Sequence, residues 1–241
     1  MYKRQDPQRV TLSYSDDVDD YASLALDRSA YTQGANVNFV MTDLLMNIDP
    51  TDEDIWSFDT TQKDILYYWM FDAGGDYQHG NPNDKIPIMR ENLHFDDNGY
   101  LEIIPNVDGS EVLKFVNNDN QVGGITSANI TNLITVVETA PNSGIFENFD
   151  DGDKSNLLVN DDASRGTTAV IDYNDSEFSI VIANEFGGIT IDKDGVGGVW
   201  NSGEEIAVTL TDPDFNKNSL EDEDITLSEP ITEFIPTVKI D

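Results

Sequence analysis

The chain has 241 residues, of which 13 are Lys or Arg and 47 are Asp or Glu, so its formal net charge is −34 at pH 7. A surface of this charge repels nucleic acid and anionic lipid and attracts cations, which excludes nucleic-acid binding through a basic patch. The absence of cysteine excludes disulfides, thiolate metal sites and cysteine nucleophiles, and no apolar run is long enough to predict a transmembrane segment.

Residues 1–21 are expected to be the tail of a preceding module. Residues 10–16 (VTLSYSD) share their pattern with residues 169–175 (AVIDYND), in which an alternating strand ends in Tyr and Asp. Residues 1–5 (MYKRQ) have two interpretations, an ordinary start or the translation of a sequencing adapter. The acidic residues at positions 16–20 favour either a junctional cation or an extended segment.

The next stretch predicts a strand followed by an acidic cluster. Val37, Phe39 and Met41 alternate with Asn38, Val40 and Thr42, which is the signature of a half-buried strand. The oxygen-bearing residues that follow this strand are Asp43, Asn47, Asp49, Asp52 and Asp54. They are candidate metal ligands, and the alternative interpretation is a solvated acidic turn.

The middle of the chain predicts a buried strand and then an insert. Residues 65–71 (ILYYWMF) form a continuous apolar run closed by Gly74-Gly75, typical of a central strand buried on both faces. Tyr14 and Tyr173, which end the two similar strands, are 159 positions apart. An immunoglobulin-like sandwich needs about 100 residues, so roughly 60 are in excess, and we assign them to an insert around residues 78–124.

Catalysis finds little support in the sequence. The two histidines, His79 and His94, have no Ser or Cys in a recognisable nucleophile setting, and pairs of carboxylates arise by chance in a chain with 47 acids. We therefore expect no enzymatic activity. Asn129 and Asn174 each begin a glycosylation sequon, and for both, glycosylation and chance occurrence stay open.

Residues from 186 onward copy the beginning of the first module. Leu26-Asp27 corresponds to Ile191-Asp192, and from Gly34/Gly203 to Asn47/Asn216 the offset is a constant 169 positions without a gap. A strand (residues 206–210) again runs into a cluster of acids and amides. The chain is therefore expected to contain the tail of one module (1–21), a complete module (22–185) and the start of a truncated third (186–241).

The second acidic cluster is the strongest candidate for a metal site. Alternating carboxylate and amide oxygens can surround one hard cation, and Ca²⁺ takes six to eight oxygens. Lys217 stands where an EF-hand loop has glycine, and no helices flank the segment, so a loop site between strands is predicted. The candidate ligands are Asp212, Asp214, Asn216, Asn218, Asp222, Glu223 and Asp224. The first copy has Leu45 in place of Asp214 and so lacks one of these carboxylates.

Many short alternating segments punctuated by Gly, Asn and Asp turns, with 38% hydrophobic residues, predict an all-β chain with a real core. Within that class, an immunoglobulin-like β-sandwich is expected for the complete module.

Three segments resemble archaeal surface-layer proteins, in particular those of ammonia-oxidising archaea. Residues 211–218 (TDPDFNKN) resemble a recurrent "TDPD-x-N" segment, residues 138–147 (ETAPNSGIFE) an "ET-x-PN-x-G-x-F-E" strand pair, and residues 168–175 a closing strand. The resemblance implies tandem immunoglobulin-like domains that tile into a porous lattice outside the cell. It also implies divalent-cation binding and a negative coat that concentrates small cations such as ammonium.

Two main hypotheses for function follow. The first is a structural, non-enzymatic segment of a self-assembling S-layer at the cell surface. The alternative is a Ca²⁺-dependent adhesin or ligand-binding module of a secreted protein. It would use exposed aromatic residues of the segment 60–132, which shares no motif with the resembled proteins, such as Trp69, Tyr77 or Tyr100. A weaker third hypothesis is an acidic enzyme of a halophile.

Overall fold

The computed structural model describes residues 22–60, 65–69, 85–89, 99–104, 111–118, 133–174 and 176–223. Several expectations concern residues outside these ranges. They are the preceding tail (1–21), most of the insert, both histidines, the sequon at Asn129 and the segment 224–241, which includes Asp224.

The described chain is built almost entirely from β-strands, and every pairing between the named strands is antiparallel. The strands are β1 (Ser23–Leu26), β2 (Phe39–Thr42), β3 (Ile55–Asp59), β4 (Ile65–Trp69), β5 (Lys85–Met89), β6 (Leu101–Ile104), β7 (Leu113–Phe115), β8 (Leu133–Glu138), β9 (Ile145–Glu147), β10 (Leu157–Val159), β11 (Thr168–Tyr173), β12 (Ser176–Val181), β13 (Gly188–Ile191) and β14 (Val208–Thr211). The helical elements are short 3-10 turns, among them η2 (Leu44–Met46), η3 (Asp194–Val196) and η4 (Pro213–Phe215). The prediction of an all-β chain is confirmed.

The strands form one large sheet and three small ones. The seven-stranded sheet has the order β1-β2-β9-β8-β3-β4-β5, and a three-stranded sheet has the order β12-β11-β6. Strands β10 and β7 form one two-stranded sheet, and β13 and β14 form another. No helix in the described ranges is long and apolar enough to cross a membrane.

Burial follows the alternation that predicted the strands. In β2, Phe39 and Met41 are buried whereas Val40 is exposed, and every second residue of β11 is buried. The apolar run at residues 65–71 does form a strand, β4. Its Leu66 is buried, but Tyr68 is only half-buried, so the expected burial on both faces is incomplete.

A buried polar contact connects the end of β2 to the core. The Asp43 carboxylate accepts hydrogen bonds from the Leu45 N–H (2.8 Å) and the Tyr173 hydroxyl (2.5 Å). The fully buried Trp56 donates its indole N–H to the Met46 carbonyl at 2.8 Å. Because η2 is held by both contacts, the loop that follows it leaves the sheet in a fixed direction.

The hairpin β13–β14 repeats the hairpin β1–β2. Ser23 pairs with Thr42 and Leu26 with Phe39 in the first hairpin, and Gly188 pairs with Thr211 and Ile191 with Val208 in the second. Strand β13 thus lies 165 positions after β1, and β14 lies 169 positions after β2. Each second strand is followed by a 3-10 turn, η2 or η4, with an Asp at its N-terminal cap. We call residues 27–38 and 192–207 the hairpin loops, and residues 43–50 and 212–219 the exit loops.

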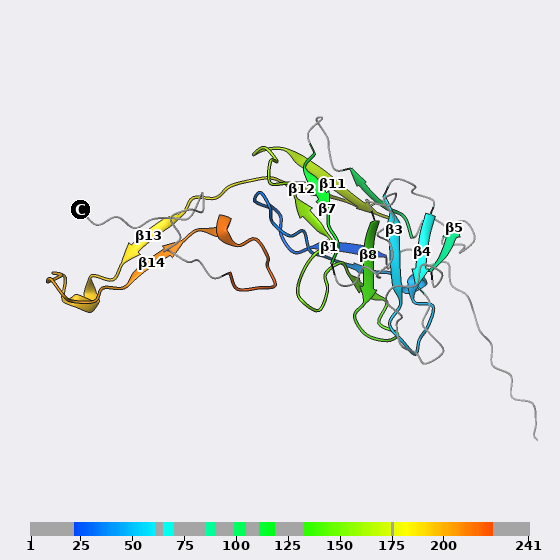
Figure 1. The fold of residues 1–241 in the computed structure, drawn as a ribbon, viewed down its shortest axis with the longest axis horizontal. Coiled ribbons are helices and arrows are strands. Elements are labelled where there is room, and N and C mark those ends of the chain that lie inside the picture. Colours follow the sequence, from blue (N-terminus) through cyan, green and yellow to red (C-terminus); the bar gives the residue numbers. More distant parts are fainter. Residues whose placement is uncertain are drawn as a thin grey trace, which may run out of the picture.

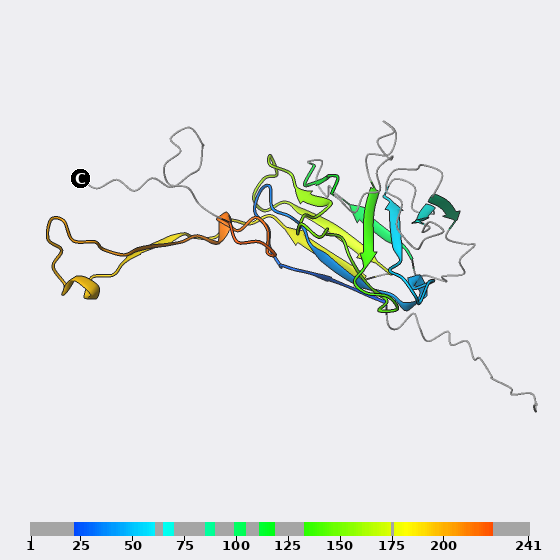
Figure 2. The same cartoon turned by 60° about the horizontal axis from the view of Figure 1, so that its bottom comes forward.

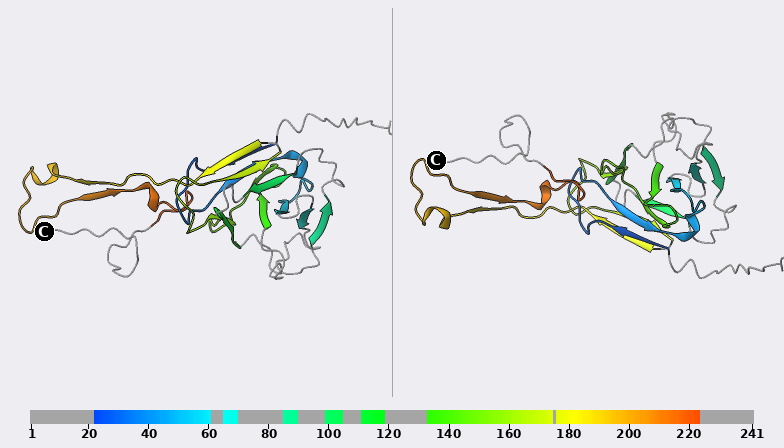
Figure 3. Two further views of the ribbon diagram at one scale, coloured as in Figure 1. Left: turned by 90° about the horizontal axis from the view of Figure 1, so that it is seen from above. Right: turned by 90° about the horizontal axis from the view of Figure 1, so that it is seen from below.

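The two hairpins differ sharply in burial. The side chain of Leu24 is 3% exposed and that of its counterpart Ile189 is 62% exposed; Phe39 is 1% exposed and its counterpart Val208 45%. Figures 1–3 show β13 and β14 projecting away from the other sheets in every view. Trp200 lies 169 positions after the buried Tyr31, so a core position would be expected for it, but in the described chain its side chain is half-exposed.

Candidate functional site

In the first copy, the candidate ligands bind their own backbone and neighbouring side chains. The buried Asp54 carboxylate accepts hydrogen bonds from the N–H groups of Ile48 (2.5 Å) and Asp49 (3.1 Å) and from the Tyr68 hydroxyl (2.7 Å). Burial raises the pKa of Asp54 above its ordinary value even though these hydrogen bonds lower it. Asp49 instead accepts from the hydroxyl and N–H of Thr51, and these hydrogen bonds lower its pKa.

Asp43 and Asn47 complete the first set, and they point to different partners. The Asp43 carboxylate accepts hydrogen bonds from the Leu45 N–H and the Tyr173 hydroxyl, as described above. Asn47 donates from its side-chain amide to Asn142 Oδ1 at 3.0 Å. Asp52 accepts a hydrogen bond from the Glu53 N–H at 3.1 Å. The five predicted ligands of this copy are thus distributed along the segment and do not surround a common point.

The second copy repeats the backbone contacts of the first. Asp212 accepts from the Asp214 N–H (3.1 Å) at the start of η4, as Asp43 accepts from Leu45. Glu223 accepts from the N–H groups of Lys217 (2.5 Å) and Asn218 (2.6 Å), as Asp54 does from the equivalent pair. The shared Asp-Ile sequence at residues 54–55 and 224–225 suggests that Asp54 corresponds to Asp224, whereas these contacts pair it with Glu223. The offset of 169 positions therefore continues beyond the exit loop.

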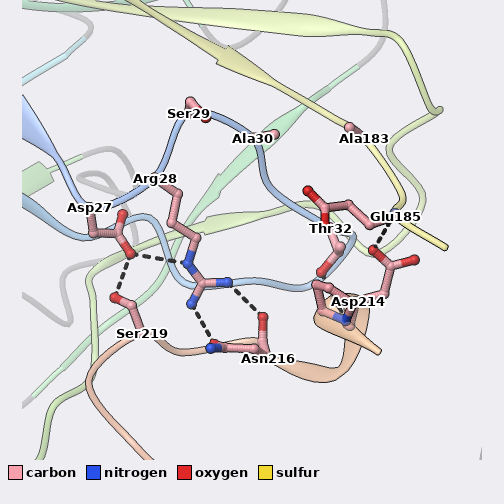
Figure 4. Close-up of a pocket in the computed structure, with 11 residues that line it drawn as sticks. Asp27, Arg28, Ser29, Ala30, Thr32, Ala183, Glu185, Asp214, Asn216 and Ser219 are labelled. Carbon is pink, nitrogen blue, oxygen red and sulfur yellow. Dashed lines mark hydrogen bonds and ion pairs between the residues drawn. The ribbon is translucent and has the colours of Figure 1, made fainter. Parts of the chain in front are cut away.

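The second exit loop lies on the first hairpin loop, and Arg28 is the main contact between them. Its guanidinium donates to the Asn216 carbonyl (2.6 Å) and to Asn216 Oδ1 (2.8 Å), and its Nε pairs with Asp27 at 3.3 Å. Figure 4 shows Arg28 between Asp27 and Asn216. The Ser219 hydroxyl donates a hydrogen bond to the same Asp27 carboxylate at 2.6 Å. We call the contact of residues 27–38 with residues 212–219 the junction.

Lys217 supplies a second cation to the junction. Its ammonium donates to Thr32 Oγ1 (2.9 Å) and to the Gln33 carbonyl (2.8 Å). Burial lowers the pKa of Lys217, while the nearby carboxylates of Asp214, Asp161 and Glu223 act in the opposite direction. A protein side chain thus places a positive charge among the acids in which a bound cation was predicted.

Uncharged contacts extend the junction on both sides. The Asn36 N–H donates to the Lys217 carbonyl at 2.7 Å. The buried Asn218 accepts from the Asn38 side-chain amide at 3.1 Å and donates to the Asp153 carbonyl at 2.6 Å. The contacts of Asn36 and Asn38 join residues about 180 positions apart in sequence, and the contact of Asn218 with Asp153 joins residues 65 positions apart. Together they hold the second exit loop against residues of the first repeat.

Asp214 connects the junction to the linker between the two repeats. Its carboxylate accepts from the Glu185 N–H at 2.9 Å and from the Asn184 side-chain amide at 3.1 Å. A cavity of about 530 Å³ opens beside it (Figure 4). Asp27, Arg28, Glu185 and Asp214 line this cavity, and the charged groups of Asp27, Arg28 and Asp214 already have partners within the chain.

The geometry does not fit a shared calcium ion. Within the described ranges, no three side chains of the types His, Cys, Asp and Glu converge into a group that could hold a metal. Asp212, Asp214 and Glu223 accept backbone N–H groups, Asn216 and Asn218 bind side chains of the first module, and Asp222 is exposed. Calcium binding by this segment stays a prediction that the described contacts do not support.

The other acidic clusters also contain local turns. Asp150 Oδ1 accepts from the N–H groups of Gly152 and Lys154, both at 3.0 Å. Asp161 forms an ion pair with Lys114 at 2.6 Å. Asp192 accepts from the N–H groups of two residues of η3 and so stabilises a local turn.

Sequence reasoning missed two residues of the site, Arg28 and Glu138. Glu138 Oε1 accepts from the Gly144 N–H at 2.6 Å and its Oε2 from the Asp54 N–H at 3.1 Å, so it joins the β8–β9 turn to the first exit loop. A signal for Arg28 was present, because a basic residue follows Asp27 in the first copy and Asp192 in the second. Neither known protein-family models nor curated proteins match this chain.

Replacing Arg28 with alanine is expected to loosen the junction. A hydrogen bond with a charged partner contributes about 1.5–3 kcal/mol, and about 1.4 kcal/mol corresponds to a factor of ten in an equilibrium constant. The N–H of Asn36, which donates to Lys217, should therefore exchange with solvent at least about tenfold faster, as measured by hydrogen exchange with NMR detection.

The control is Arg165→Ala, which removes the same charge from an exposed position. The N–H of Val37, bonded to Leu157 inside the module at 2.9 Å, serves as the internal reference and should stay protected in both variants. Equal exchange of Asn36 in the Arg28 and Arg165 variants would contradict the assigned role of Arg28.

The variant Asp214→Ala distinguishes a hydrogen-bonding role of Asp214 in the junction from a role as a calcium ligand. Because Asp214 accepts two hydrogen bonds from the linker, its loss should speed exchange at Asn36 by the same factor in calcium and in sodium at matched ionic strength. Asp222→Ala should have no effect, since Asp222 is exposed.

Calcium at a hundredfold excess over Kd would stabilise a true site by about 2.7 kcal/mol. A calcium-specific stabilisation of the wild type that Asp214→Ala abolishes would support the calcium site instead.

Proposed function

We propose that the chain is a structural, non-enzymatic segment of an archaeal-type S-layer protein, and that its repeats are immunoglobulin-like modules joined in tandem at the cell surface. The observation that carries the proposal is the junction, in which the exit loop of one repeat lies on the hairpin loop of the repeat before it. The contact uses Arg28 and Lys217 in a chain with only 13 basic residues.

A junction of this kind suits a protein that must keep its repeats in a fixed relative orientation. Two-stranded hairpins are marginal by themselves, and tandem repeats are stabilised by contacts between neighbours. The Asn36 and Asn218 contacts prevent the hairpin β13–β14 from rotating freely about the linker at residues 183–187. Fixed orientation between repeats is what a regular two-dimensional lattice requires of its subunits.

The net charge of −34 supports a second part of the proposal. A negative layer raises the local concentration of divalent cations and of small monovalent cations such as ammonium, and it excludes anions. The Debye length is about 8 Å at physiological ionic strength, so the effect reaches only the pores and the immediate surface of the layer. Much of the insert on which the adhesin alternative depends lies outside the described residues.

Immunogold electron microscopy of intact cells that produce the protein tests its location and arrangement. Antibody against this chain should label the outer surface densely and evenly, because an S-layer covers the whole cell. Layers isolated from the same cells should enrich ammonium over chloride at low ionic strength and lose that enrichment at high salt. Label confined to the cell interior, or scattered at isolated points on the surface, would contradict the proposal.

A further inference from the structure

The two cations of the junction bind uncharged acceptors across it. The Arg28 guanidinium donates to the carbonyl and the side-chain oxygen of Asn216, and the Lys217 ammonium donates to a hydroxyl and a carbonyl of the first repeat. In the described ranges, the ion pair of Arg28 is with Asp27 of its own repeat. The junction is thus held by short contacts between charged groups and neutral oxygens, and salt screens such close, partly buried contacts only slightly.

Charges of the same sign repel each other across the junction at longer range. Residues 22–185 contain 29 acidic and 7 basic residues, and residues 186–241 contain 13 and 3, so the two repeats have formal charges of −22 and −10. Asp27 of the first repeat and Asp214 of the second line the same cavity (Figure 4). The Debye length, which sets the range of this repulsion, is about 30 Å at 0.01 M salt and about 8 Å at 0.15 M.

One attraction across the junction acts in the opposite direction. The Asp161 carboxylate of the first repeat attracts the Lys217 ammonium, but its side chain is 73% exposed and already paired with Lys114 at 2.6 Å. Burial is the main cause of the lowered pKa of Lys217, and the charge of Arg28 lowers it further, so the two junction cations also repel each other. Repulsion therefore exceeds attraction among the charges that act between the repeats.

We propose that the junction is a hinge controlled by ionic strength, which is rigid at high salt and mobile at low salt. Salt screens the long-range repulsion between the repeats and leaves the short contacts of Arg28 and Lys217 in place. An interface held by exposed ion pairs would respond with the opposite sign, because salt weakens such pairs. The inference rests on the junction contacts alone and goes beyond the proposed function, since it holds wherever the protein is located.

The hinge has a defined pivot. The Ala183 N–H donates to the Tyr31 carbonyl at 3.0 Å, which fixes the start of the linker to the first repeat. Asp214 then holds the linker to the second exit loop through the Glu185 N–H. Figures 1 and 2 show the hairpin β13–β14 joined to the other sheets through this linker and the exit loop. When the contacts of the exit loop with the first repeat break, the hairpin turns about the residues that follow Ala183.

Hydrogen exchange with NMR detection on the full chain tests the inference at 0.01 M and 0.3 M NaCl, between which the Debye length falls from about 30 Å to below about 8 Å. The Asn36 N–H donates to the Lys217 carbonyl across the junction, so it should exchange at least about tenfold more slowly at the higher salt. The Val37 N–H, bonded to Leu157 within the first repeat, should keep the same protection at both salt concentrations.

A charge variant separates screening from other effects of salt. The combined substitutions Asp151→Asn, Asp162→Asn, Glu205→Gln and Glu221→Gln neutralise two exposed acids of each repeat. At 0.01 M NaCl this variant should exchange Asn36 more slowly than the wild type, because removing the charges relieves the same repulsion that salt screens. At 0.3 M the two should agree. The matched control Asp151→Glu, Asp162→Glu, Glu205→Asp and Glu221→Asp keeps every charge and should behave as the wild type at both concentrations.

Two results would overturn the inference. Exchange of Asn36 that is faster or unchanged at the higher salt would mean that repulsion between the repeats does not control the junction. A salt effect of equal size in the wild type and the neutralised variant would mean that salt acts through hydration and not through screening. Both results would leave the proposed function standing, which fails separately if the immunogold label is absent from the cell surface.

Discussion

The carboxylate at the end of the second strand of each repeat is the constraint on which the rest of the site depends. Asp43 and Asp212 each accept the N–H two residues later, which starts a 3-10 turn and ends the strand. A second carboxylate, Asp54 or Glu223, then accepts the first N–H groups after the turn. Together the two carboxylates fix the exit loop from its own backbone, before any partner is bound.

The two exit loops therefore share the same pattern of hydrogen bonds from backbone N–H groups to carboxylates, but they contact different parts of the chain. The first exit loop is held to its own module by Tyr173 and Glu138, and the second is held to the preceding repeat by Arg28 and the residues around it. Hydrogen bonds from backbone N–H groups favour the charged form of a carboxylate, although burial still raises the pKa of Asp54. Two of the 13 basic residues, Arg28 and Lys217, lie where two acidic surfaces meet, and their charge offsets the mutual repulsion of those surfaces.

The strands and the repeat could be predicted from sequence because period-2 alternation and an ungapped offset are local properties of the chain. The role of the acidic residues in the exit loops could not be predicted from sequence. Spacing alone does not distinguish an oxygen that faces a cation from one that faces a backbone N–H, since both need carboxylates in a turn. The exposure of Trp200 and Ile189 was also beyond sequence reasoning, because it depends on which strands pack over the second hairpin.

Pulsed electron spin resonance between one label on strand β12 and one on strand β14 of the second hairpin measures the central claim most directly. The chain has no cysteine, so Glu177→Cys on β12 and Thr209→Cys on β14, both exposed, would carry the only labels. A fixed junction predicts one narrow distance distribution that broadens when Arg28 is replaced with alanine. A broad distribution in the wild type, unchanged by that substitution, would contradict the account.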